Sequence, residues 1–151
     1  MLAVHCDNSM SPRWTPDPNI RRGRSQVSNL HVHLVFVTKY RKRVLTKPIL
    51  ERCRQVMAKT CSDFGATLAE FNGEQDHVHL LVHYPPTVRL STLVNSLKGV
   101  SSRVLHKQFP DHIGRYLYKG RLWSPSYFAG SCGGAPLSIV AQFIANQKSP
   151  A

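Results

Sequence analysis

Acidic side chains are scarce in this chain, in which 8 Asp and Glu stand against 20 Lys and Arg among 151 residues. The formal charge is +12 and the pI is near 10.1. Such an excess favours a polyanionic partner, most often nucleic acid, because each neutralised phosphate releases condensed counterions. Ribosomal and membrane-surface proteins share this property, so charge alone identifies no chemistry.

Long apolar runs are missing as well, because none approaches the roughly 20 residues that a transmembrane helix needs. The N-terminal segment has no uninterrupted apolar stretch of signal-peptide length. We therefore expect a cytoplasmic protein with no membrane partner. The four cysteines form no C-x-x-C pair, and their spacing suits neither a zinc knuckle nor a disulfide framework. Free thiols are the expectation.

The chain divides into an arm and one domain. Residues 1–26 are rich in Pro, Arg and Ser and lack periodicity, which indicates a flexible basic arm, and residues 27–151 form the domain. Apolar periodicity predicts strands over 30–37, 66–71, 77–84 and about 123–129, and helices over about 47–63, 90–108 and 136–147.

Punctuation residues separate these elements. We expect a turn at Asn72-Gly73 and a basic loop after Pro110. The order β-α-β-β-α-β-α predicts an α+β fold, an antiparallel sheet with flanking helices of the ferredoxin-like or RRM-like kind.

The D-H-V-H segment at 76–79 is the sharpest chemical pattern in the sequence. Alternate residues of a strand point to the same face, so His77 and His79 project together about 7 Å apart and can hold one divalent ion. An H-V-H segment at 31–33 repeats the pattern within a longer apolar run, which indicates a structural role. We therefore choose the second pair, which has an acidic neighbour and follows a turn.

The last predicted helix offers a third donor. Phe143 and Gln147 are four residues apart and therefore neighbours on one helical face. A Gln carbonyl is a hard oxygen donor, and with two imidazoles it would leave open positions for a phosphate oxygen and water, which suits Mg²⁺ or Mn²⁺. A solvated polar residue is the alternative reading of Gln147.

Several segments resemble one known family. They read HLVFVTKYRKRVL at 33–45, DHVHLLV at 76–82, LVNSLKGVSSRVLHKQFP at 93–110, LWSPSYFAGSCGGAP at 122–136 and QFIANQ at 142–147. In this order they resemble the His-hydrophobic-His (HUH) single-tyrosine transposases of bacterial insertion sequences. Members of that family cut single-stranded DNA beside a hairpin through a 5′-phosphotyrosine, and the freed 3′ hydroxyl later reseals to another end.

The resemblance implies roles for individual residues. His77, His79 and Gln147 would ligate Mg²⁺ or Mn²⁺, and in a homodimer with composite active sites the last helix of each subunit would reach the histidines of the other. Contacts to single-stranded DNA hairpins would come from basic residues whose alternative reading is a solvated face: Lys39, Arg41, Lys42, Arg43, Lys98, Arg103, Lys119 and Arg121.

Phe143 departs from the family pattern, because it occupies the position of the nucleophilic tyrosine. A benzene ring cannot attack phosphorus, so we expect a protein that binds DNA and metal without cleaving. A non-enzymatic nucleic-acid-binding protein, such as a domesticated repressor or RNA chaperone, is the alternative. A metal-dependent nuclease that uses water as its nucleophile is a third reading.

Overall fold

The structure is a computed structural model that describes residues 20–22, 27–117, 120–131 and 137–147. The strands are β1 (Arg21–Arg22), β2 (Val27–Ser28), β3 (His31–Val37), β4 (Thr67–Gly73), β5 (His77–His83) and β6 (Phe128–Ser131). The helices are α1 (Lys47–Asp63), α2 (Leu90–Gln108), α3 (Pro110–Tyr116) and α4 (Leu137–Ala145), with a 3-10 turn at Lys39–Arg41.

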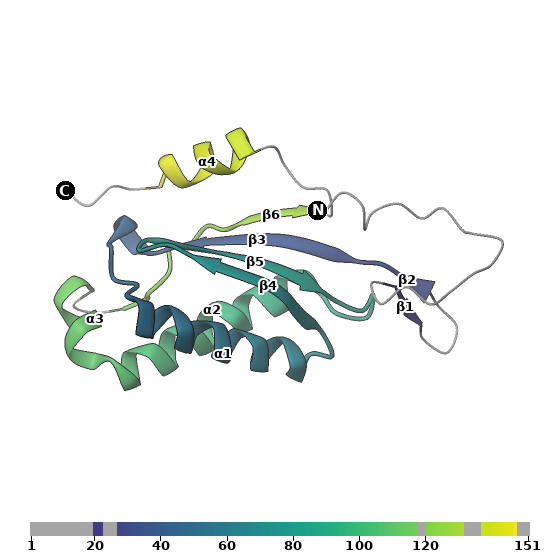
Figure 1. Cartoon of the computed structure of the whole chain (residues 1–151), viewed down its shortest axis with the longest axis horizontal. Coiled ribbons are helices and arrows are strands. Elements are labelled where there is room, and N and C mark those ends of the chain that lie inside the picture. The colour runs from purple at the N-terminus through teal and green to yellow at the C-terminus, as the bar shows by residue number, and fades with distance from the viewer. Residues whose placement is uncertain (1–19, 23–26, 118–119, 132–136, 148–151) are drawn as a thin grey trace.

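The central feature is a four-stranded sheet in the order β4-β5-β3-β6. Every neighbouring pair is antiparallel. Helix α1 connects β3 to β4 and helix α2 connects β5 to β6, and β3 and β5 are the two central strands. Figure 1 shows α1 and α2 along one face of this sheet and α4 along the other. The predicted α+β, ferredoxin-like architecture is therefore confirmed.

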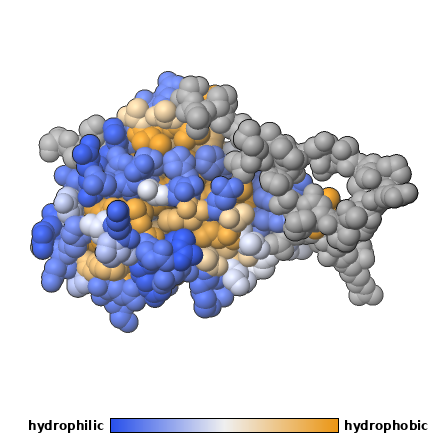
Figure 2. All heavy atoms as spheres, viewed as in Figure 1, coloured by the Kyte–Doolittle hydropathy of each residue, from blue (hydrophilic) through white to orange (hydrophobic). Residues whose placement is uncertain are grey.

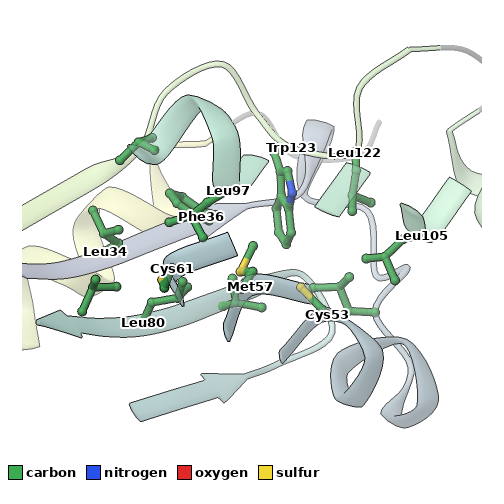
Figure 3. Packing of buried hydrophobic residues seen from close by; sticks show 14 of the residues in the cluster. Leu34, Phe36, Cys53, Met57, Cys61, Leu80, Leu97, Leu105, Leu122 and Trp123 are labelled. Atoms are coloured by element: carbon green, nitrogen blue, oxygen red, sulfur yellow. The ribbon is translucent and has the colours of Figure 1, made fainter. Parts of the chain in front are cut away.

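The alternation of β3 and β5 sorts their side chains between two cores. Leu34, Phe36 and Leu80 are fully buried on the face covered by α1 and α2, and Figure 3 shows them packed near Met57 of α1. Val35 belongs to a second, smaller cluster on the opposite face. Successive residues of a strand point to opposite faces, so the histidines at 33, 77 and 79 share the face of Val35.

The helix ends follow ordinary sequence signals. Thr46 occupies the N-cap of α1 and Pro48 lies in its first turn, where a missing N–H costs nothing. Gly65 follows the helix with φ of 73°, a left-handed conformation that glycine tolerates best. In Figure 2 hydrophilic residues gather in the lower part of the molecule, where Figure 1 shows α1. Hydrophobic residues are visible between them and above them.

Several local predictions were wrong. The segment after Phe109, predicted as a basic loop, begins with α3, which has Pro110 in its first turn and Asp111 nearby to interact with the helix dipole. Asn72 and Gly73 lie within β4 rather than in a turn. A Cβ at Gly73 would overlap Leu50 Cδ2, so the Leu50 side chain of α1 would have to shift to admit any larger residue there.

The remaining differences lie near the two ends of the chain. The last strand begins at Phe128, while Trp123 forms only an isolated bridge with Thr38. The last helix ends at Ala145, two residues earlier than predicted. Two residues of the expected arm, 21–22, form β1 and pair with β2; residues 1–19 and 23–26 lie outside the described residues. No helix in the described part of the chain is long and apolar enough to cross a membrane.

Candidate active site and nucleic-acid interface

The predicted metal pair lies at the start of β5, on the sheet face away from α1 and α2. The ring centroids of His77 and His79 are 5.0 Å apart and the rings are nearly perpendicular. Both side chains are partly buried. The strand therefore brings two imidazoles together as the alternation predicted.

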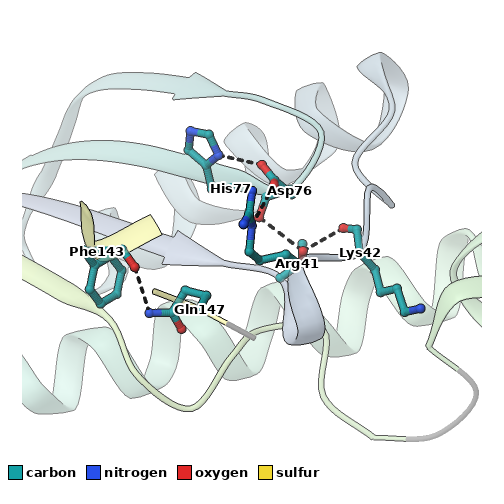
Figure 4. A network of polar contacts seen from close by, with 7 residues as sticks. Arg41, Lys42, Asp76, His77, Phe143 and Gln147 are labelled. Carbon is teal, nitrogen blue, oxygen red and sulfur yellow. Dashed lines mark hydrogen bonds and ion pairs between the residues drawn. The ribbon is translucent and has the colours of Figure 1, made fainter. Parts of the chain in front are cut away.

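Asp76 anchors the first of these rings. Its Oδ1 lies 2.7 Å from His77 Nδ1, and its Oδ2 lies 3.5 Å from Arg41 Nε (Figure 4). An ionised carboxylate can only accept hydrogen bonds, so Nδ1 of His77 donates. In the neutral ring, Nε2 then keeps its lone pair available for a metal ion, and such carboxylate–histidine pairs are common beside bound metals.

His33 of β3 contacts the second ring. His33 Nε2 lies 3.2 Å from His79 Nδ1, and the two ring planes are 18° apart with their centroids separated by 5.4 Å. Burial, reinforced by the neighbouring His77 and His33, lowers the pKa of His79 to about 4. Burial also lowers the pKa of His33, against a smaller opposing effect of Glu70. His79 is therefore neutral at pH 7, the form that metal coordination requires.

Helix α4 covers the same face of the sheet. Val140 is buried with Val35 and Val37, and Phe143 packs against this cluster. The Phe143 ring lies 6.0 Å from the ring of Phe128 in β6. The fold thus places Phe143 and the histidines over one face of the sheet, although their residues are more than 60 positions apart in the sequence.

Gln147 lies just beyond α4 and is held by the loop that precedes β6. Its Oε1 accepts hydrogen bonds from Ser124 Oγ at 2.9 Å and Ser126 Oγ at 3.0 Å. Its Nε2 donates to the Phe143 carbonyl at 3.1 Å (Figure 4). Within the described ranges, no group of three or more His, Cys, Asp or Glu is placed to hold a metal ion. The two imidazoles suit a divalent ion, and Gln147 as third ligand stays a prediction.

A basic cavity of about 840 Å³ lies beside the outer surface of α2. It is bounded by α2 and by the loop that leads to β6, and none of its described lining residues is acidic. The lining consists of Asn95, Lys98, Gly99, Ser102, Arg103, His106, Lys107, Gly120, Arg121, Trp123 and Pro125. Fixed positive charge around a hollow of this size suits a phosphate backbone.

A sequence profile of the family described as "Transposase IS200 like" matches residues 26–147, which is most of the chain. The chain belongs to the IS200-like transposase family. The ISDra2 transposase TnpA of Deinococcus radiodurans is 31% identical over 108 residues, which cover 72% of this chain and 76% of that protein. The IS200 transposase of Salmonella typhimurium is 29% identical over 106 residues, 70% of this chain and 68% of that one.

Solved structures confirm the fold of this transposase-family chain. A crystal structure at 1.90 Å resolution of a chain described as a transposase from Deinococcus radiodurans is similar, with 30% identity and a TM-score of 0.79. The match covers 86% of this chain and 99% of that one. A REP-associated tyrosine transposase, solved with a REP hairpin, shares the fold at 12% identity and a TM-score of 0.50, over 76% of this chain and 61% of that one.

The basic residues predicted for this family member fall into two groups. Lys98, Arg103 and Arg121 line the cavity beside α2. The others, Lys39, Arg41, Lys42 and Arg43, lie in and beside the 3-10 turn at the end of β3, where Arg41 contacts Asp76. Lys119 lies outside the described residues.

The turn between β3 and α1 has an unusual backbone. Tyr40 and Arg41 have φ of 61° and 55°, and Lys39 Nζ lies 5.4 Å from the centre of the Tyr40 ring. Lys42 offers its carbonyl to Thr38 Oγ1 at 2.7 Å. This turn points Arg41 at Asp76, so one of the predicted DNA contacts also supports the His77 anchor.

Some candidate residues were missed by sequence reasoning. His33 was assigned a structural role, but it contacts His79 directly. His106 and Lys107 line the cavity, and their spacing from Arg103 along α2 is the signal that could have found them, because residues three and four apart share a helical face.

Proposed function

We propose that this chain binds hairpin-containing single-stranded DNA at the ends of an insertion sequence and holds a divalent metal ion, Mg²⁺ or Mn²⁺, at His77 and His79. The observation that carries the proposal is the anchoring of His77 Nδ1 by Asp76, which leaves Nε2 available to an ion. A hairpin is a sensible first ligand, because a chain of the same fold was solved with one.

Such an ion would polarise the oxygens of a scissile phosphate. The chain itself would supply the two imidazoles, and burial lowers the pKa of His79 to about 4, so that this ring is neutral at pH 7. Gln147 is proposed as the third ligand, from its own or a second subunit, after it leaves the two serine hydroxyls that hold it here. A homodimer with composite active sites is part of the same proposal.

Strand cleavage is the step that this chain is proposed to lack. Phe143 lies on α4 over the histidine face but carries no hydroxyl that could attack phosphorus. A 5′-phosphotyrosine forms only where a tyrosine hydroxyl lies close to the reacting phosphate. We therefore propose DNA and metal binding without formation of a 5′-phosphotyrosine.

Restoring the hydroxyl tests the proposal. Phe143→Tyr, incubated with labelled single-stranded DNA from the element's ends and Mg²⁺, is expected to form a covalent protein–DNA adduct. Phe143→Tyr combined with His77→Ala and His79→Ala is the matched control, which should bind the DNA but form no adduct. An adduct in this control would refute the metal site.

The basic cavity favours a second candidate, a non-enzymatic nucleic-acid-binding protein such as a repressor or RNA chaperone, because it lies beside α2 and not on the histidine face. That candidate predicts intact hairpin binding and no adduct with Phe143→Tyr. A water-using nuclease predicts that the unaltered chain cleaves DNA without an adduct.

A further inference from the structure

The two imidazoles of the candidate metal site are held in the same way, each through Nδ1. His77 Nδ1 contacts Asp76 Oδ1 at 2.7 Å, and His79 Nδ1 contacts His33 Nε2 at 3.2 Å. A histidine that ligates a metal through one nitrogen usually directs its other N–H to a partner that fixes the tautomer and the ring orientation. Asp76 is such a partner for His77. His33 lies at the corresponding nitrogen, Nδ1, of His79.

We propose that His33 is a positioning residue, whose Nε2 accepts the Nδ1–H of His79 and thereby keeps His79 Nε2 deprotonated and directed at the ion. This inference rests on the metal site of the proposed function. It assigns His33 the tautomer with its hydrogen on Nδ1, because a neutral imidazole accepts at one nitrogen and donates at the other.

The sheet register explains why these rings meet. Across β3 and β5, His33 stands opposite Leu81 and His79 stands opposite Val35. The two histidines are therefore diagonal neighbours on one face, a relation within reach of long or aromatic side chains. Phe128 of β6 packs edge-on against the His33 ring at 6.1 Å and supports it from the other side.

A supporting role fits His33 better than a ligand role. Its Nε2 already faces His79 Nδ1, and the planes of the two rings are only 18° apart. The Nε2 lone pair of His33 lies in its ring plane and points at His79, so it is not directed at an ion bound to His79 Nε2. This agrees with the absence, among the described residues, of a group of three His, Cys, Asp or Glu that could hold a metal.

The chain provides an internal control in His31. His31 lies two residues before His33 on the same face of β3. Its ring stacks on the ring of His83, with the centroids 4.2 Å apart, and His83 is the residue paired directly with His31 across β3 and β5. The histidines of the two H-V-H segments therefore have different partners: His31 contacts His83, His33 contacts His79, and His77 contacts Asp76. Replacement of His31 changes a histidine of the same strand without touching His79.

The first test uses the metal-free, unaltered chain. Long-range ¹H–¹⁵N NMR of the imidazoles is expected to show the hydrogen of His79 on Nδ1 and that of His33 also on Nδ1. A His79 ring with its hydrogen on Nε2 would overturn the inference, whatever the metal data show. This measurement does not depend on any variant folding.

The second test measures Mn²⁺ binding by calorimetry on the full-length chain, with folding checked by circular dichroism. His33→Leu is expected to weaken Mn²⁺ binding by roughly 10–100-fold, as loss of such a partner typically does. His33→Gln, whose carbonyl can still accept from His79 Nδ1, should restore most of the affinity. His31→Gln should bind as the unaltered chain does.

The outcomes separate this inference from the proposed function. If the unaltered chain binds no Mn²⁺, or if His79→Ala binds it equally well, the metal site itself is wrong. If His79→Ala abolishes binding while His33→Leu retains full affinity, the metal site stands and the role of His33 is wrong.

Discussion

The basic cavity beside α2 makes a quantitative prediction about how DNA binding depends on salt. Arg103, Lys107 and Arg121 line it, and none of these three side chains takes part in a salt bridge among the described residues. Each is therefore available to a phosphate. We expect the triple substitution of these residues by Gln to weaken binding of a DNA hairpin and to flatten its salt dependence.

The magnitude follows from counterion release. Each neutralised phosphate contributes about 0.7 to the slope of log K against log salt for single strands and about 0.9 for duplex DNA. Loss of three contacts should therefore reduce the slope by about 2.1 to 2.7. When the salt rises from 50 to 200 mM, the unaltered chain should therefore lose roughly 20 to 40 times more affinity than the variant does. Fluorescence anisotropy with a labelled hairpin across this range measures both slopes.

A matched control is a second triple variant with the same net charge as the cavity variant. Arg52, Arg54 and Lys59 lie on α1, where Arg54 pairs with Glu51 and Lys59 with Asp63. Substituting these three residues by Gln also removes three positive charges, but it should leave the slope nearly unchanged. Equal slope reductions in the two triple variants would show that overall charge, and not the cavity, governs binding.

Two further predictions concern the core. Cys53 and Cys61 are fully buried, and burial raises the pKa of each thiol to about 12, so in a background without the other two cysteines neither should react with Ellman's reagent at pH 8 until the protein is unfolded. Gly73→Ala should destabilise the protein by about 1–3 kcal/mol in urea denaturation, because its Cβ would overlap Leu50. Gly114→Ala, which meets nothing within 4 Å, should be neutral or stabilising; equal losses in both would contradict the packing argument.

Sequence patterns were sufficient where a single local rule determined the structure. The helix of residues 47–63 was predicted at its observed bounds, because its apolar spacing, N-cap and terminal glycine all agree. The choice of His77 and His79 depended on strand alternation and on the acidic neighbour, and the structure shows that Asp76 does contact His77. The order of elements predicted an antiparallel sheet with flanking helices, and the structure has this architecture.

Two of the failures involve contacts between segments far apart in the chain, and a third is local. The role of Gly73 depends on Leu50, which lies 23 residues earlier, so a turn was the natural reading of Asn-Gly. The contact between His33 and His79 depends on the register of two strands. The alternation of apolar and polar residues shows which face a side chain occupies, but not which residues of two strands are paired. Helix α3 was hidden by the basic character of its surroundings, although Pro110 followed by Asp111 is a recognisable start signal.

Lys98 shows why a basic residue in the cavity need not be a phosphate contact. Its Nζ donates to the carbonyls of Ser124 at 2.7 Å and Pro125 at 3.1 Å and lies 5.7 Å from the centre of the Tyr127 ring. Burial, with a smaller effect of Arg121, lowers its pKa. These bonds occupy two of the three N–H donors of the ammonium group.

We therefore expect Lys98→Met to affect stability more than DNA binding. Loss of the two charge-assisted bonds, of which the one to Ser124 is partly buried and the one to Pro125 is exposed, should cost about 1–2 kcal/mol, or roughly 2–8 °C in the melting temperature of a domain of this size. The salt slope should change less than in Arg103→Gln, where a reduction of about 0.7–0.9 is expected. An unchanged melting temperature together with a full reduction in slope would show instead that Lys98 releases Ser124 and Pro125 to bind phosphate.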